Sequence, residues 1–123
     1  MIKRISSTGV RVTDHNRAYD FYVNKLGFEV RKDEVVESGY FWLEVAPGGA
    51  DTSLAVGPPT SEDSSVPLGG FAHIVFDTDD IRATYAELSG RGVRFVEEPT
   101  EKPWGGVQAQ FVDPDGNIFV LVE

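Results

Sequence analysis

The chain has 123 residues, of which 41% are hydrophobic, and its 20 acidic and 11 basic residues give a net charge of -9. This length suits one compact domain with its own core, and the charge opposes binding to nucleic acid or to an anionic membrane surface. The absence of cysteine excludes disulfides, thiolate nucleophiles and thiolate metal ligands. There is neither an apolar run near the roughly 18 residues of a membrane span nor a basic-then-apolar leader. We therefore expect a cytoplasmic protein.

The first part of the chain is typical of a strand, a helix and three further strands. After the β-rich "VRVT" comes a helical stretch that begins at Asp14, a residue type able to cap free N–H groups, and ends at Gly27, suited to a left-handed turn. Alternating, β-rich residues then predict three strands, Phe28 to Val36, Tyr40 to Ala46 and Thr52 to Val56. Residues 1–57 thus form a βαβββ module.

A linker over residues 58–70, rich in Pro, Ser, Gly and acidic residues, precedes a second module that repeats this order. An offset of 66 aligns Asp14 with Asp80, and Asp79 or Asp80 is the expected cap of the second helix. Predicted strands of this module, residues 71–123, are Arg94 to Glu97, Val107 to Val112 and Ile118 to Val122, with the turn "DPDG" before the last one. Matched order of elements favours a duplication.

Two segments, "FYVNKLGF" and "DPDGN", carry a family resemblance when they are taken together with the repeat. The chain resembles the vicinal oxygen chelate superfamily, which includes glyoxalase I, extradiol dioxygenases, fosfomycin-inactivating transferases and metal-free bleomycin-binding proteins. The resemblance implies an α+β fold in which two tandem βαβββ modules form a curved, partly open mixed β-barrel with the helices outside. A ligand is then expected on the concave face, where enzymatic members hold a divalent metal.

The resemblance also assigns metal-ligand positions to the first and last strands of each module. In this chain the positions hold Ser7 and Ser53 in the first module, and His73 and Val120 in the second. Only the imidazole is a competent ligand, whereas a catalytic metal usually takes three protein ligands. We therefore predict no metal cofactor. The alternative is a divalent Zn, Ni, Mn or Fe ion held by His73 with an unexpected partner, for which Glu44 is the candidate.

Strand alternation assigns further side chains to the concave face, because every second residue of a strand points to the same side. Apolar Val10, Val12, Leu43 and Val45 are expected to pack under the helices. The predicted ligand-binding residues on the other face are Arg11, Trp42, Glu44, His73 and Asp77. For His73 the alternative is a polar side chain hydrogen-bonded on the pocket wall, and for Arg11 and Asp77 it is an ion pair that contributes little.

Trp104 completes the predicted ligand-binding set. It lies in "EKPWGGVQAQF", between a proline and two glycines, on a loop before the penultimate strand. An indole on such a loop can stack on a ligand or a cation at the mouth of a cavity, or it can fill the core at an edge of the barrel. Gln108 and Gln110 share one face of the next strand, toward either the cavity or solvent.

These features favour a protein that binds a small organic ligand, such as an antibiotic or a metabolite, without a catalytic metal. The first alternative is a metal-dependent lyase, isomerase or dioxygenase of the glyoxalase type, so whether the chain is an enzyme stays open. A structural or protein-interaction domain is the second alternative, although charged residues on the inner face argue against it. We expect a homodimer, because dimerisation would cover exposed sheet edges. The sequence is compatible both with modules that pair within one chain and with modules exchanged between two chains.

Overall fold

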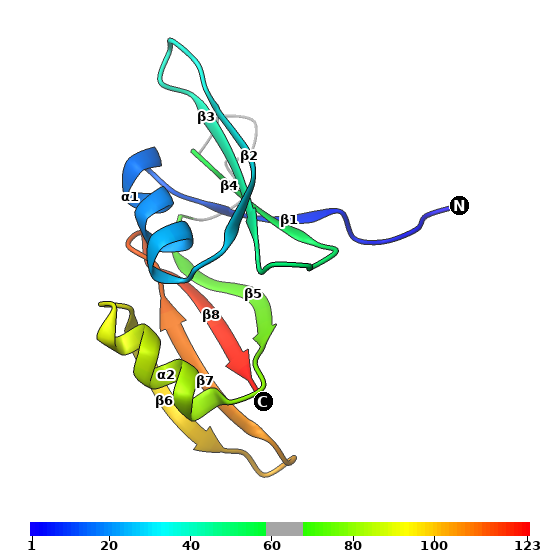
Figure 1. The fold of residues 1–123 in the computed structure, drawn as a ribbon, viewed down its shortest axis with the longest axis vertical. Helices are drawn as coiled ribbons and strands as arrows, with labels where there is room; N and C mark the ends of the chain where they lie inside the picture. The colour runs from blue at the N-terminus through cyan, green and yellow to red at the C-terminus, as the bar shows by residue number, and fades with distance from the viewer. Residues whose placement is uncertain (59–67) are drawn as a thin grey trace. The chain divides into compact units, whose positions relative to one another are not determined.

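The computed structural model describes residues 1–58 and 68–123, and the chain divides into two compact units, Met1–Leu68 and Gly69–Glu123. Each unit is one four-stranded mixed sheet with helical residues on one face (Figure 1), and neither sheet closes on itself. Most of the linker predicted over residues 58–70 lies outside the described residues. Within the described part of the chain, no helix has the length and apolarity needed to cross a membrane.

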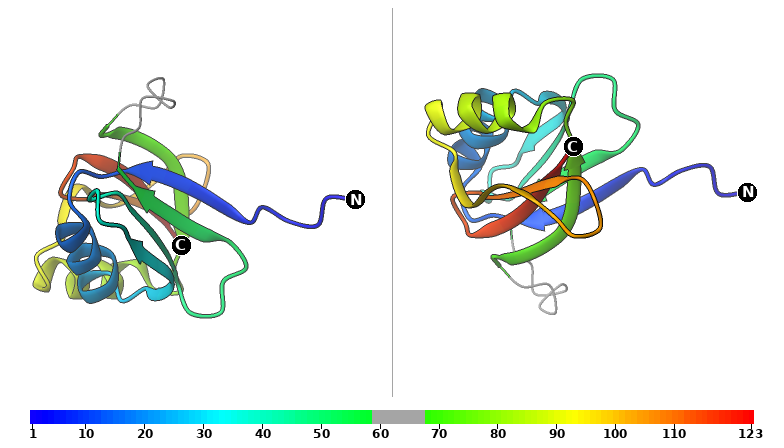
Figure 2. Two further views of the ribbon diagram at one scale, coloured as in Figure 1. Left: turned by 90° about the horizontal axis from the view of Figure 1, so that it is seen from above. Right: turned by 90° about the horizontal axis from the view of Figure 1, so that it is seen from below.

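The first unit has the predicted βαβββ order, with its strands arranged β1-β4-β3-β2 across the sheet. Its strands are β1 (Ser7–Arg11), β2 (Glu29–Val35), β3 (Phe41–Ala46) and β4 (Ser53–Gly57). The two strands β1 and β4 run side by side and parallel (Figure 2), while β3 is antiparallel to both of its neighbours. All of β2 is exposed, as expected for a strand at the edge of a sheet.

Helical residues between β1 and β2 begin and end where the sequence predicts, but they do not form one uniform helix. Asp14 accepts a hydrogen bond from the backbone N–H of Arg17, and Gly27 is left-handed with φ of 78°. Between them α1 (His15–Tyr19) is α-helical, whereas η1 (Asp20–Lys25) is a wider π-helical turn in which Leu26 N–H donates to Phe21 O. The two caps could be predicted because they depend on residues close in the sequence. The wider π-helical turn gives no such local signal.

The core of the first unit lies between these helical residues and the sheet. Leu43 and Val45 of β3 are fully buried, as are Val12 and Tyr22, and Val10 is 8% exposed. The predicted alternation along β1 and β3 is therefore confirmed. Burial of such apolar side chains contributes about 1.5–3 kcal/mol each, which holds β3 in a register that turns Trp42 and Glu44 to the opposite face.

The second unit repeats this arrangement, with strand order β5-β8-β7-β6 and parallel pairing of β5 with β8. Its elements are β5 (Gly70–Asp77), α2 (Ile81–Gly90), β6 (Arg94–Glu101), β7 (Val107–Val112) and β8 (Asn117–Val122). Helix α2 lies over β6 and β7 (Figure 1). Asp80 rather than Asp79 caps α2, because its side chain accepts the Ala83 N–H.

Aromatic rings fill the space between α2 and its sheet. Phe111 and Phe119 are stacked with ring centroids 5.4 Å apart, and Phe76 lies against both. Phe95 of β6 packs edge-on against Tyr85 of α2 at 4.7 Å. Such ring pairs contribute about 0.5–1.5 kcal/mol beyond the burial of their area, so this layer fixes which face of each strand is turned away from the helix.

Strand β6 is longer than the sequence predicts, since it continues past Pro99 to Glu101. Its pairing with β7 shifts between Phe95 and Glu97 and again between Glu97 and Thr100. Proline is tolerated there because β6 is an edge strand and the pairing is already interrupted by bulges. The prediction that this strand ends at Glu97 was therefore wrong, because Pro99 does not end an edge strand.

Candidate functional site

The face of each sheet turned away from the helical residues is termed the open face. In the second unit it carries rows of residues that lie opposite one another in neighbouring strands. One row runs from Val75 through Val120 and Gln110 to Glu97. The next holds Asp77, Val122, Gln108 and Thr100. Apart from Asp77, apolar residues from β5 and β8 thus border a polar strip from β7 and β6.

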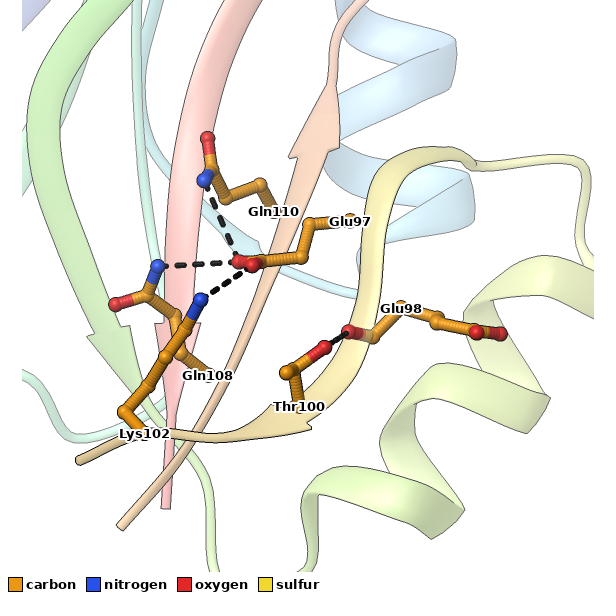
Figure 3. A network of polar contacts seen from close by, with 6 residues as sticks. All are labelled: Glu97, Glu98, Thr100, Lys102, Gln108 and Gln110. Carbon is orange, nitrogen blue, oxygen red and sulfur yellow. Dashed lines mark hydrogen bonds and ion pairs between the residues drawn. The ribbon is translucent and has the colours of Figure 1, made fainter. Parts of the chain in front are cut away.

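A network centred on Glu97 occupies the polar strip (Figure 3). The Lys102 ammonium donates to Glu97 Oε2 at 2.5 Å, and the Nε2 atoms of Gln108 and Gln110 donate to Oε1 at 3.1 and 3.3 Å. The side chains of Glu97 and Lys102 are only 22% and 18% exposed. The carboxylate therefore has three donors in a partly buried position, an arrangement that strengthens charge-assisted hydrogen bonds.

The same contacts keep Glu97 ionised. Its hydrogen bond with Lys102 holds the pKa of the Glu97 carboxyl below its usual value, against the opposing effect of partial burial, and the two amides add to the lowering. An ionised carboxylate only accepts hydrogen bonds, so each glutamine must present its amide nitrogen to Glu97. In Figure 3 the carbonyl oxygens of Gln108 and Gln110 accordingly point away from Glu97.

A cavity of about 250 Å³ lies beside this network, at the hairpin between β6 and β7. Its walls are formed by Lys102, Trp104, Gly105, Gly106, Val107, Gln108, Val122 and Glu123. Trp104 is 75% exposed, so its indole is not part of the core. Gly105 and Gly106 both have φ near 90°, which allows the tight hairpin that carries the ring. Trp104 thus lies on the wall of this hairpin cavity.

His73 lies in an irregular part of β5 and not at the start of a regular strand. Pairing with β8 shifts between Phe71 and Val75, and His73 in this interval has φ of 57°. A left-handed conformation is uncommon for residues other than glycine, although His adopts it more often than most. The imidazole is exposed and packs edge-on against the Phe71 ring at 4.5 Å. Asp77, at the far end of β5, shares a row with Val122 and Gln108.

The open face of the first unit carries three of the predicted residues. Trp42 Nε1 donates to Glu44 Oε2 at 2.8 Å, and a side chain added at Gly57 would meet the Trp42 ring at 3.5 Å. Arg11 lies opposite Gly57, and its Nη1 donates to the Pro58 carbonyl at 2.9 Å. Trp42 and Glu44 are therefore a hydrogen-bonded pair, and Arg11 lies opposite Gly57, against which the Trp42 ring packs.

The positions that the resemblance assigns to metal ligands do not fit a metal within either unit. In the first unit Ser7 pairs with Ser53, and in the second Val120 pairs with Val75, two residues beyond His73. The described residues include no group of three or more His, Asp or Glu side chains placed to hold a metal ion. Register also makes Ala55, not Ser53, the counterpart of Val120, since Ala55 lies opposite Gly9 as Val120 lies opposite Val75.

The sequence did not predict that Glu97 and Lys102 belong to a polar network on the open face. Strand alternation in "VQAQF" did place Gln108 and Gln110 on one face, but the partner of that face depends on the two bulges of β6. A run of acidic residues next to a lysine is common on protein surfaces and carries no such signal. Only the pairing of β6 with β7 brings the carboxylate to the glutamines.

This geometry agrees with the similarity of the chain to known proteins. Residues 4–121 match the family model of the Glyoxalase/Bleomycin resistance protein/Dioxygenase superfamily. The chain belongs to this superfamily. A crystal structure of a superfamily member from Sphaerobacter thermophilus is 40% identical, with a TM-score of 0.90 over 99% of this chain and 98% of that one. The family and fold expected from the sequence are thus confirmed.

Two further similar superfamily proteins have names that point to different activities. TnmS3, described as an antibiotic binding protein from Streptomyces sp. CB03234, is 40% identical, with a TM-score of 0.81 over 98% of this chain and 95% of that one. A probable lactoylglutathione lyase from Synechocystis sp. is 31% identical over 94% of this chain and 92% of its own length. The names of these two similar proteins therefore include both a binding protein and a probable enzyme.

Proposed function

We propose that this protein binds a small organic molecule, such as an antibiotic or a metabolite, on the open faces of its sheets and without a catalytic metal. The observation that carries the proposal is the cavity of about 250 Å³ at the β6–β7 hairpin, which has an exposed indole on one wall and Lys102 and Gln108 on others. An apolar surface with a few placed polar groups is the usual composition of a ligand site. The antibiotic-binding relative supports the same reading.

The proposed ligand contacts are those expected from the sequence, with roles that their surroundings support. In the second unit, Trp104 stacks on the ligand. The first unit, taken by itself, offers the hydrogen-bonded pair of Trp42 and Glu44 as an aromatic surface with an acceptor. His73 and Asp77 present polar groups from β5. Arg11 completes the proposed set, and the net charge of -9 favours neutral or cationic ligands over anions.

Thermal-shift screening of purified protein against antibiotics and central metabolites tests this proposal. We expect at least one compound to raise the Tm, and titration calorimetry to give a Kd that Trp104→Ala weakens by about tenfold, the loss of one stacking contact of roughly 1–1.5 kcal/mol. Val30→Ala, which truncates an exposed residue of β2, is the matched control and leaves the Kd unchanged. A hit whose affinity both variants leave intact contradicts the role of Trp104.

The second candidate function is a divalent-metal-dependent lyase, isomerase or dioxygenase of the glyoxalase type. The relative named as a probable lactoylglutathione lyase favours it. We expect metal analysis of untagged protein, and calorimetric titration with Ni, Zn, Mn and Fe(II), to give no stoichiometric binding, because His73 is the one competent ligand among the assigned positions. Tight binding that His73→Ala abolishes would support the enzyme instead.

A further inference from the structure

The side-chain amides of the two glutamines on β7 are held in one orientation on the open face of the second unit. Each amide nitrogen donates one of its two N–H groups to the Glu97 carboxylate, at 3.1 and 3.3 Å. Each amide has one carbonyl oxygen, and in Figure 3 both oxygens point away from Glu97. Reversing either amide would set a carbonyl against a carboxylate, which is repulsive. Glu97 therefore determines the orientation of both glutamines.

Lys102 makes this arrangement stable at neutral pH. Its ammonium lies 2.5 Å from Glu97 Oε2, so the cluster carries no net charge although it lies on a strongly acidic protein. Lowering of the Glu97 pKa by this contact keeps the carboxylate ionised and accepting. The Glu97–Lys102 pair thus holds the two neutral glutamine acceptors in place and adds no net charge that would attract an ion.

Both glutamines have an apolar neighbour in β8, and Gln108 also adjoins the cavity that has Trp104 on its wall. Val120 lies beside Gln110 and Val122 beside Gln108 in the neighbouring strand. Gln108 and Val122 also line the cavity that holds Trp104 on its wall. A molecule in this place gains from apolar or aromatic area and, at the two glutamine carbonyls, from hydrogen-bond donors.

We infer that the site selects ligands that carry N–H donors on an apolar or aromatic body, and that Glu97 is the positioning residue for this choice. The inference rests on the proposed function and adds the chemical class of the ligand. Donor-bearing groups of this class are primary amides, ureas and amines. Ligands that offer only acceptors at the same place, such as esters, leave the two carbonyls unpaired, which costs affinity.

Two neutral probes of matched size, 2-naphthamide and methyl 2-naphthoate, test the inference, because they differ mainly in an NH2 group in place of a methoxy group. Binding is followed by ¹⁵N-HSQC titration, which observes the Trp104 indole and the side-chain amides directly. We expect the amide to bind the native protein about tenfold more tightly than the ester, the effect of one to two net hydrogen bonds. Shifts are expected at Trp104, Gln108 and Gln110.

Glu97→Gln and Glu98→Gln form a matched pair of variants. Both remove one negative charge from β6, but the Glu98 side chain points away from the glutamines (Figure 3). Glu97→Gln supplies an amide that must itself find an acceptor, so one of the β7 glutamines is free to reverse. We expect the tenfold preference to fall to about twofold or less in Glu97→Gln and to persist in Glu98→Gln, with circular dichroism confirming that both variants are folded.

A second readout needs no probe. In the native protein the side-chain NH2 signals of Gln108 and Gln110 are expected to show the displaced shifts of protons bonded to a carboxylate, and these shifts are lost in Glu97→Gln only. Equal binding of amide and ester to the native protein would overturn the inference while leaving the proposed binding function standing. A tenfold preference for the amide that persists in Glu97→Gln would also overturn the inference. Failure of both probes to bind does so too, and the broader compound screen then decides the proposed function separately.

Discussion

At the scale of single residues, His73 differs most from what its sequence neighbours imply. An imidazole between Ala72 and Ile74 in a β-rich segment is typical of a regular strand, yet its φ of 57° places it in the left-handed region inside an interruption of the β5–β8 pairing. Such strain costs about 1 kcal/mol or more and is often found at functional sites. The conformation turns the ring toward Phe71.

Substitution of His73 by Gly and by Val tests this conformation. Glycine adopts a positive φ without strain, whereas a β-branched residue resists it. We expect His73→Gly to be more stable than His73→Val by about 2 kcal/mol, measured as free energies of unfolding in urea. Equal stability of the two variants would contradict a left-handed residue at this position. The same Gly variant removes the imidazole, so its ligand affinity reports whether His73 contacts a ligand.

At the scale of elements, the Glu97 cluster joins strand β6, strand β7 and the hairpin between them. Lys102 belongs to the hairpin, and its backbone N–H also donates to Gly106 O at 3.1 Å. The cluster therefore links the carboxylate on β6 to the loop that carries Trp104. Loss of the link is expected to loosen the cavity wall as well as the sheet edge.

This coupling predicts a pH dependence whose sign follows from the lowered pKa of Glu97. A carboxyl with a lower pKa in the folded state contributes stability that is present above its unfolded pKa and is lost as pH falls through the folded value. We expect the free energy of unfolding of native protein to exceed that of Glu97→Gln by about 1 kcal/mol at pH 7. The difference should shrink as pH falls below the usual pKa of a glutamate and disappear below the lower folded-state pKa of Glu97. Urea unfolding at a series of pH values measures it, and a constant difference would contradict an ionised Glu97.

The two units carry different chemistry at equivalent places in their sheets. Glu44 lies opposite Ala55 and Lys32, just as Gln110 lies opposite Val120 and Glu97. In the first unit the carboxylate is on the third strand and accepts from Trp42. In the second unit the carboxylate is on the edge strand. The pairing of the strands is therefore the same in both units, whereas the polar groups on the open face differ.

At the scale of the whole molecule, the expected homodimer remains a prediction. Phe71 and Val75 of edge strand β5 are 48% and 58% exposed in the single chain, and an unpaired apolar edge is commonly covered by association. Analytical ultracentrifugation at micromolar concentration should give a mass of twice the 13.5 kDa chain. A mass of one chain across the concentration range would contradict the dimer and leave the β5 edge exposed.

Features that depend on short stretches of chain could be read from the sequence. These are the helix caps at Asp14 and Asp80, the left-handed Gly27 and the side of β3 on which Trp42 and Glu44 lie. Each depends on neighbours a few residues away, because capping and alternation are local properties of the backbone. With the repeat of these features in both halves, they were sufficient for the family and the α+β fold.

The sequence by itself thus determined the repeated βαβββ plan and the faces of its regular strands, since both follow from local periodicity. Only the tertiary structure decided which residues lie opposite one another in the irregular strands β5 and β6. Bulges in β6 set Glu97 opposite Gln110, and the shift in β5 separates His73 from the row of Val120. Bulges arise where packing of a whole sheet outweighs local preference, so no short segment reports them, and the cluster most informative about a ligand is of this kind.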